Sequence, residues 1–220
     1  MIITLDGPAG AGKSSTARAL ARRLGWFYMD TGAMYRAATL VALERDLALD
    51  DAAALAALAE SLAIAFRDGR VFVGDRDVSA EIRTERITAA TRRVADAPPV
   101  REVMKRMQRR LAAGIDVVTE GRDQGSVVFP QAELKVFLTA SAEERALRRH
   151  REETGRGVAT SLEAILDAQN RRDEGDRIRA VGAMKAAADA VVVETDGLTQ
   201  DEVVDRLVRL VEERRPPPTP

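Results

Sequence analysis

Residues 7–14 have the types and spacing to bind phosphate. They read Gly-Pro-Ala-Gly-Ala-Gly-Lys-Ser and fit the pattern G-x-x-x-x-G-K-[ST]. In such a loop the backbone N–H groups turn inward around a phosphate, and the next helix adds positive partial charge from its N-terminus. Lys13 would reach the β- and γ-phosphates of a nucleotide, and the Ser14 hydroxyl would ligate Mg²⁺. The predicted contact residues are Gly7, Pro8, Ala9, Gly10, Ala11, Gly12, Lys13, Ser14 and Ser15.

The segments around this loop have the order that the motif requires. Residues 1–6 form a short apolar run typical of a buried parallel strand, and residues 15–24 have a helical pattern that ends at Gly25. Strand, glycine loop and helix is the context in which the pattern binds phosphate. The alternative is a chance match to a short pattern, and the flanking elements count against it.

Further charged residues gather in four short clusters, which are residues 30–36, Arg101, residues 120–123 and residues 172–179. The first follows an expected strand at 26–29, and the third follows one at 115–119. Ligands of open α/β sheets bind at the carboxyl ends of the strands, so we expect both clusters to face the crevice of the phosphate loop. Several arginines at one crevice suit phosphoryl transfer, which depends on positioning and charge neutralisation more than on acid–base chemistry.

For most arginines the simpler interpretation is a solvated helix face. We assign to it Arg18, Arg22, Arg23, Arg45 and Arg209. Arg122 differs because it stands in a glycine turn directly after a buried strand, which favours a functional role. Arg172, Asp176 and Arg179 are spaced i, i+4, i+7 and so share one helix face. An intrahelical salt bridge explains that spacing equally well.

The other segments indicate a doubly wound α/β fold. Strand patterns at 134–138 and 190–193 alternate with helical ones, the last of which is capped at Thr199. Helical segments are also expected at 52–62, 80–93 and 100–112. Brief β-type runs at 64–66, 71–73 and 77–78 are separated by turn signals. We therefore expect a parallel sheet with helices on both faces, and a small antiparallel insert between its second and third strands.

Composition limits the class of protein. The chain has 220 residues, of which 45% are hydrophobic and 31% charged, and the net charge is −1. No apolar run approaches the length of about 18 residues that a membrane span needs, and the immediate first strand leaves no room for a signal peptide. The absence of cysteine excludes disulfides, thiolate metal sites and cysteine nucleophiles. These features predict a cytoplasmic protein with no membrane and no nucleic-acid partner.

Taken in order, the motifs resemble those of bacterial cytidylate kinases, which are P-loop nucleoside monophosphate kinases. Beyond the phosphate loop, the resemblance rests on Asp-Thr-Gly-Ala-Met-Tyr-Arg at 30–36, Val-Ser-Ala-Glu-Ile-Arg at 78–83, Gly-Arg-Asp at 121–123, Val-Val-Phe-Pro at 127–130 and Arg-Asp-x-x-Asp-x-x-Arg at 172–179. It covers the chain from residue 2 to about residue 210. The departures are Glu120 where the family often has Asp, Thr91-Arg92 near a family serine that touches the base, and Gly-Ala-Met at 182–184 where the family has Ala-Pro-Leu.

The resemblance implies transfer of the ATP γ-phosphoryl group to CMP or dCMP with Mg²⁺, in pyrimidine metabolism. It implies a P-loop kinase core over 1–36, 114–147 and 161–215, with an NMP-binding insert over 37–113. It further implies a lid over 148–160 and a monomer. The last helix is expected to stop before Pro216-Pro217-Pro218, and residues 216–220 to be disordered.

It also implies roles for single residues. Thr31, Arg36 and Arg122 match positions that hold the acceptor phosphate, and Tyr35 one that lines the acceptor site. Arg101 and Asp123 match base-reading positions. The matches to ribose and phosphate contacts are Arg172, Asp176 and Arg179. Arg148, Arg149 and Arg151 lie where the family's lid approaches the triphosphate. The implied catalytic residues are Lys13, Arg122, Arg148, Arg151 and Arg179.

Three alternatives remain open at this point. The chain could be another small-molecule P-loop kinase, for a nucleoside monophosphate or for shikimate. It could be a GTPase-type switch, although it has no Asn-Lys-x-Asp guanine motif. It could also bind nucleotides without catalysis, although Lys13, Ser14 and the arginines are those of a catalyst. The sequence leaves undecided CMP against dCMP, the tolerance of UMP, and which lid arginine meets the transferring group. It also leaves undecided whether Thr91 or Arg92 touches the base, and the oligomeric state.

Overall fold

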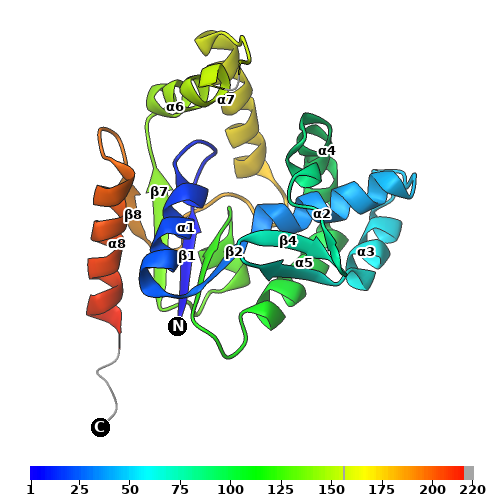
Figure 1. Cartoon of the computed structure of the whole chain (residues 1–220), viewed down its shortest axis with the longest axis horizontal. Helices are drawn as coiled ribbons and strands as arrows, with labels where there is room; N and C mark the ends of the chain where they lie inside the picture. Colours follow the sequence, from blue (N-terminus) through cyan, green and yellow to red (C-terminus); the bar gives the residue numbers. More distant parts are fainter. Residues whose placement is uncertain (156, 216–220) are drawn as a thin grey trace. The chain divides into compact units, whose positions relative to one another are not determined.

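The structure is a computed structural model that describes residues 1–155 and 157–215 (Figure 1). The expected disordered tail at 216–220 lies outside the described residues. The chain divides into two compact units. The core unit contains Met1–Tyr28 and the chain from Ile115 onward, and the insert unit is Met29–Gly114.

The core unit is built on a sheet with strand order β2-β6-β1-β7-β8. The strands are β1 (Ile2–Asp6), β2 (Phe27–Asp30), β6 (Val117–Glu120), β7 (Leu134–Thr139) and β8 (Val191–Glu194). β1 pairs in parallel with β6 and β7, and β7 in parallel with β8. The predicted parallel sheet is confirmed. Since β1 is central, the phosphate loop that follows it begins in the middle of the sheet's carboxyl edge.

Helices α1 (Lys13–Leu24), α6 (Ala142–Gly155), α7 (Leu162–Ile178) and α8 (Gln200–Arg214) complete this unit. α1 and α8 pack side by side (Figure 1). Their apolar faces meet the sheet in a core that includes Ile3, Leu5, Leu20, Val136 and Leu207. The buried apolar side chains of β1 and β7 thus fix these two strands, whose carboxyl ends lead to the polar residues of the candidate site.

Helix boundaries differ from the sequence predictions in places that affect the site. α7 is capped by Ser161, whose hydroxyl accepts from the Ala164 N–H. It ends at Ile178, and Arg179 has left the helical conformation with φ −56° and ψ 132°. The spacing predicted that Arg179 shares a helix face with Arg172 and Asp176. This prediction is wrong, because Arg179 lies directly beyond the end of the helix.

The insert unit contains α2 (Thr31–Glu44), α3 (Ala52–Ser61), α4 (Glu85–Ala95) and α5 (Pro98–Leu111). A sheet of order β3-β4-β5 is antiparallel, with β3 (Ile64–Arg67), β4 (Arg70–Val73) and β5 (Arg76–Asp77). The predicted meander is confirmed. α5 begins earlier than the expected segment at 100–112, because Pro98 and Pro99 form its first turn, where proline's missing N–H is not needed.

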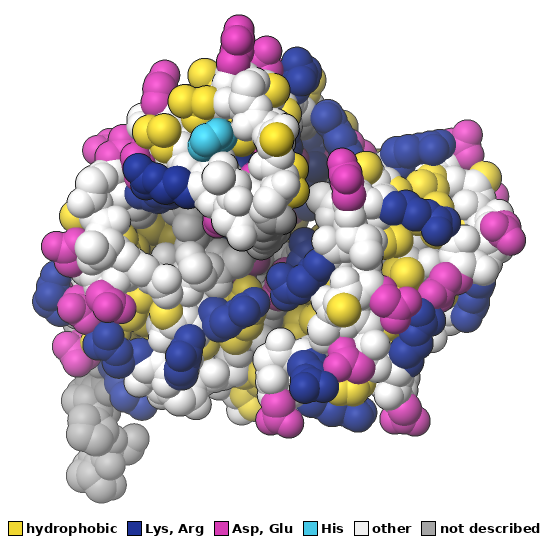
Figure 2. All heavy atoms as spheres, turned by 45° about the horizontal axis from the view of Figure 1, so that its top comes forward, with side chains coloured by type: hydrophobic (Ala, Val, Ile, Leu, Met, Phe, Trp, Pro, Cys, Tyr) yellow, Lys and Arg dark blue, Asp and Glu magenta, His cyan; other side chains and the backbone are white. Residues whose placement is uncertain are grey.

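The described surface carries mixed charge. Figure 2 shows one face of the molecule, on which Lys and Arg side chains are interspersed with Asp and Glu side chains. Among the helices of residues 1–155 and 157–215, none combines the length and apolar character that a membrane crossing requires.

Candidate active site

The phosphate loop connects β1 to α1 and depends on glycine at its first position. Gly7 has φ 141°, and a Cβ there would lie 2.0 Å from the Leu138 carbonyl oxygen of β7. The loop can lie against β7 only because this residue has no side chain. Gly12, the N-cap of α1, has the left-handed φ of 85° and no side chain with which to cap the helix. The first N–H groups of α1 are thus left for an anion.

Lys13 is buried in the loop, and its Nζ donates to the Pro8 carbonyl oxygen at 2.7 Å. Burial and the nearby positive charge of Arg122 lower the pKa of Lys13 to about 7, and Arg172 adds to the effect. Glu120 and Asp6 act in the opposite direction. Positive charge from α1, from the loop after β6 and from α7 therefore converges here, and a polyphosphate would relieve the repulsion.

Ser14 and Glu120 form a pair of oxygen groups beside Lys13. The Ser14 hydroxyl donates to Glu120 Oε1 at 2.8 Å, and Glu120 is buried at the end of β6. A hydroxyl and a carboxylate are hard oxygen donors of the kind that Mg²⁺ takes. In the part of the chain that the structure describes, no group of three or more His, Cys, Asp and Glu residues gathers as a metal cage. The donor set fits Mg²⁺ held by one or two protein oxygens together with substrate phosphates.

Asp6 joins the end of β1 to the loop that carries Arg122 and Asp123. Its carboxylate oxygens accept from the Gln124 and Gly125 N–H groups at 2.8 and 2.7 Å. These residues begin a π-helical turn, η2 (Gln124–Val128). Burial raises the pKa of Asp6 to about 7, although both backbone hydrogen bonds oppose the rise. The sequence patterns assigned Asp6 no role, although its place directly before Gly7 at a strand end was a signal.

Asp176 of α7 holds two of the predicted arginines. Arg122 Nε lies 2.7 Å from Asp176 Oδ2, and Arg179 Nη2 lies 2.7 Å from Oδ1. Burial opposes ionisation, but the two guanidinium groups hold the pKa of Asp176 below its ordinary value. Asp176 thus pairs with Arg179, which is near in sequence but lies beyond the end of α7, and with Arg122, which is far away in sequence.

Arg148 stands beside the phosphate loop. A Cβ on Gly12 would lie 3.9 Å from Arg148 Nη1. Arg148 is held by Glu144, at 2.9 Å from its Nε, and by the hydroxyl and carbonyl oxygens of Thr195. Arg151 is exposed on α6, and Arg149 pairs with Glu153 on the same helix. Arg148 is thus a lid arginine whose guanidinium lies next to Gly12 of the phosphate loop.

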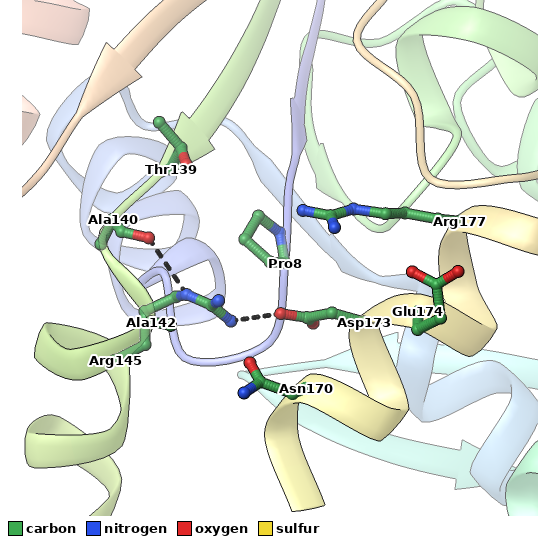
Figure 3. Close-up of a pocket in the computed structure, with 9 residues that line it drawn as sticks. All are labelled: Pro8, Thr139, Ala140, Ala142, Arg145, Asn170, Asp173, Glu174 and Arg177. Atoms are coloured by element: carbon green, nitrogen blue, oxygen red, sulfur yellow. Dashed lines mark hydrogen bonds and ion pairs between the residues drawn. The ribbon is translucent and has the colours of Figure 1, made fainter. Parts of the chain in front are cut away.

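A cavity of about 500 Å³ opens next to Pro8 (Figure 3). It is lined by the end of β7, by the start of α6 and by α7, through Thr139, Ala140, Ala142, Arg145, Asn170, Asp173, Glu174 and Arg177. Arg145 and Asp173 point toward one another at its wall. Neither residue had a predicted role.

In the insert unit, Asp30 organises the first turn of α2. Its carboxylate accepts from the Ala33 N–H at 2.8 Å, and Arg36 Nη2 lies 3.3 Å from Oδ2. A Cβ on Gly32 would lie 3.0 Å from Arg36 Nη1, so glycine leaves room for the guanidinium. Among the described residues, Arg36 Nε is buried with no hydrogen-bond partner, and Thr31 beside it is buried. An unsatisfied guanidinium donor is what an anion would complete.

Arg101 and Tyr35 also come together in this unit. The Arg101 guanidinium lies 5.7 Å from the centroid of the Tyr35 ring, and its Nη1 donates to the Ala95 carbonyl at 3.1 Å. The Thr91 hydroxyl donates to the Ile87 carbonyl at 2.6 Å, and Arg92 pairs with Asp96. Asp123 is buried in the core unit.

Comparison with known proteins identifies the family. The sequence model of cytidylate kinases matches residues 3–213. The chain is 52% identical over 213 residues to the cytidylate kinase of Rhodopirellula baltica, covering 97% of this chain and 93% of that protein. It is 46% identical to that of Mycobacterium avium, with 97% and 96% covered. The chain belongs to the cytidylate kinase family. It is therefore a phosphotransferase, and the resemblance seen in its motifs is confirmed.

Solved structures agree at the level of the fold. TT1252 from Thermus thermophilus matches with a TM-score of 0.53 and 22% identity, over 99% of this chain and 98% of that one. The shikimate kinase of Acinetobacter baumannii in complex with shikimate matches with a TM-score of 0.50 and 15% identity, over 97% and 94%. These likenesses confirm the P-loop kinase fold of a cytidylate kinase family member.

Proposed function

We propose that this chain transfers the γ-phosphoryl group of ATP to CMP or dCMP and forms CDP or dCDP. The observation that supports it best is the buried Lys13 of the phosphate loop, whose pKa is lowered by burial and by the positive charges of Arg122 and Arg172 from two other segments. Such a cluster stabilises the charge on the equatorial oxygens of a phosphoryl group in transfer.

We assign the donor site to residues 7–15. Their amides and Lys13 would hold the triphosphate, and Ser14 with Glu120 would hold Mg²⁺, in keeping with their contact at 2.8 Å. Bound with ATP, the metal ion supplies neutralisation of charge on the β- and γ-phosphates. Arg148 is the lid arginine that we assign to the donor, because its guanidinium stands next to Gly12.

We assign the acceptor phosphate to Thr31, Arg36 and Arg122. The buried, unpartnered Nε of Arg36 in the described structure supports this role. Arg172, Asp176 and Arg179 would contact ribose and phosphate, and Tyr35 would line the site. An acceptor phosphate is already anionic near neutral pH, so the transfer needs no general base. The arginines orient the attacking oxygen and stabilise developing charge.

Base selection is assigned to Arg101 and Asp123. Cytosine presents an N4 amino donor beside the N3 and O2 acceptors. A carboxylate accepts from the amino group, and an arginine donates to the acceptors. Uracil would set its O4 acceptor against the Asp123 carboxylate and leave both unpaired, a mismatch of about 1–3 kcal/mol.

The remaining assignments are also proposals. Residues 37–113 would act as the NMP-binding insert and 148–160 as a lid that closes and excludes water. A monomer in the cytoplasm without nucleic-acid partners agrees with the cysteine-free composition and the net charge of −1.

An acceptor panel tests the reaction. The purified chain is incubated with ATP and Mg²⁺, and with CMP, dCMP, UMP, AMP or shikimate in turn, and ADP release is followed by a coupled assay. We expect CMP or dCMP to give the highest kcat/KM. Higher turnover with AMP or shikimate, or ADP release with no acceptor at all, would contradict the proposal.

A further inference from the structure

Arg145 of α6 and Asp173 of α7 form an ion pair in the interior of the core unit (Figure 3). Arg145 Nη1 lies 2.5 Å from Asp173 Oδ2, and the side chains are 6% and 4% exposed. A buried ion pair contributes little net stability, because desolvation offsets the attraction. We therefore explain the pair by the other hydrogen bonds that the two side chains make.

Both side chains bind the backbone of one residue in the phosphate loop. Arg145 Nη1 donates to the Ala9 carbonyl oxygen at 2.8 Å, and Asp173 Oδ1 accepts from the Ala9 N–H at 3.3 Å. Ala9 is thus held through its donor and its acceptor by one ion pair. Arg145 Nε also donates to the Ala140 carbonyl at 3.1 Å, which ties the same guanidinium to the end of β7.

Packing around the pair leaves the loop little freedom. A Cβ on Gly10 would lie 3.1 Å from Arg145 Cβ and 3.3 Å from Gln169 Oε1. Gln169 of α7 in turn donates to the Ala142 carbonyl at the start of α6, at 3.0 Å. The loop therefore rests directly on the joined helices α6 and α7, and a change at Arg145 or Asp173 would reach it first.

We propose that Arg145 and Asp173 are positioning residues that clamp Ala9 and so hold the phosphate loop in its nucleotide-binding shape. Amides that already point at a phosphate need no reorganisation when it binds, and this raises affinity. The inference depends on the donor site of the proposed function, but not on the identity of the acceptor.

Two single variants test the clamp. Asp173→Asn keeps an oxygen for the Ala9 N–H but removes the charge that holds Arg145, and Arg145→Met removes the donors to Ala9 and Ala140. We expect each to weaken ATP binding, measured by calorimetry, by about ten-fold or more, as for loss of a charged hydrogen bond. CMP affinity should stay within about two-fold, since these bonds touch no acceptor contact. The double variant should be no worse than the weaker-binding single one, because both act through Ala9.

The control is the pair Lys135 and Asp189 of the same unit. Lys135 is likewise a buried cation, 2.8 Å from Asp189 Oδ2, and it also donates to a backbone carbonyl, that of Pro130. Lys135→Met should lower the melting temperature but leave ATP affinity unchanged. Equal loss of ATP affinity in Lys135→Met and Arg145→Met, or none in Asp173→Asn, would overturn the clamp.

Hydrogen exchange gives a second measurement that survives partial destabilisation. In Asp173→Asn, exchange should quicken in the peptide that contains Ala9 while peptides from β1 and β7 stay protected. Uniform quickening would mean that the pair only stabilises the fold. ATP binding is measured without an acceptor, so a failed acceptor panel with a positive clamp result would reject the proposed function alone.

Discussion

The core unit and the insert unit hold the arginines of the candidate site in different ways. In the core, Arg122 and Arg179 each lie 2.7 Å from an oxygen of the buried Asp176. In the insert, Arg36 lies 3.3 Å from Asp30, and Arg101 contacts a backbone carbonyl at 3.1 Å and the Tyr35 ring at 5.7 Å. Short charge-assisted bonds fix a guanidinium in place, whereas longer or neutral contacts are exchanged for a ligand at low cost.

This contrast indicates a division of labour. The proposed transfer takes place at the core's cations, where geometry must be set before the nucleotides arrive. In the proposed function Arg36 of the insert would meet the acceptor, which enters and leaves in every cycle, so the long contact of Arg36 to Asp30 suits that role. The contrast can be tested by measuring whether substitutions in the core reduce activity more than matched substitutions in the insert do.

The largest effect should be on the pH dependence of core stability. Burial lowers the pKa of Lys13 to about 7 from 10.5, so the unfolded chain binds more protons between those values and stability rises with pH across that window. Burial raises the pKa of Asp6 from 3.8 to about 7, so the folded chain binds more protons there, and stability falls as pH rises from about 4 to 7. A pKa that differs by one between the folded and unfolded chain changes the free energy of unfolding by about 1.4 kcal/mol.

Urea unfolding across pH separates the two contributions. Relative to the unsubstituted protein, Lys13→Met should remove the rise in the free energy of unfolding above pH 7. Asp6→Asn should remove the fall in the free energy of unfolding between about pH 4 and 7. The control is Asp205→Asn, which affects a pair with Arg23 whose side chains are both 51% exposed. If the difference in free energy of unfolding between Lys13→Met and the unsubstituted protein did not change with pH, the lowered pKa of Lys13 would be refuted.

Next in size is the effect of Lys13→Met on turnover. The variant loses the ammonium that would stabilise the transferring group, so kcat should fall by about 10²–10³-fold, the usual cost of one such donor. Steady-state kinetics with CMP as acceptor measures it. Near-full turnover would remove Lys13, and with it the phosphate loop, from the chemistry.

The comparison itself is tested by Asp176→Asn in the core against Asp30→Asn in the insert. A neutral amide at residue 176 would no longer balance Arg122 and Arg179, so kcat/KM for CMP should fall by about 10-fold or more. Asparagine at residue 30 can still accept from the Ala33 N–H as an N-cap, and the contact to Arg36 is already long, so the loss should stay within about three-fold. Equal losses would refute the difference between the units.

The fold and the phosphate loop could be predicted because their signals are local. Strand, loop and helix lie next to one another in residues 1–24, and the meander's turns are marked by Asp68-Gly69 and Gly74-Asp75. The end of α7 was misplaced because Arg179 continues a helical spacing that the backbone leaves. Nothing in that spacing shows where the chain turns away.

The clamp could not be predicted because it joins segments far apart in the chain. Arg145 stands in an arginine-rich helix, in which Arg149 and Arg151 are exposed. Only the tertiary packing of α6 on α7 and the loop buries it. Asp173 was likewise not singled out, because roles in the motif at 172–179 were assigned only to Arg172, Asp176 and Arg179.

The smallest effect should be the change in base preference in Asp123 variants. Asp123→Ala removes the carboxylate assigned to the cytosine amino group, so the ratio of kcat/KM for CMP to that for UMP should fall by about five-fold or more. ATP affinity should change little. Asp123→Asn sharpens the test, because a side-chain amide can accept from N4 of cytosine in one orientation and donate to O4 of uracil in the other. It should therefore raise UMP activity as well as lower CMP activity. If both variants kept the CMP to UMP ratio, base selection would have to lie in the insert, with Arg101, and the core would serve the phosphates alone.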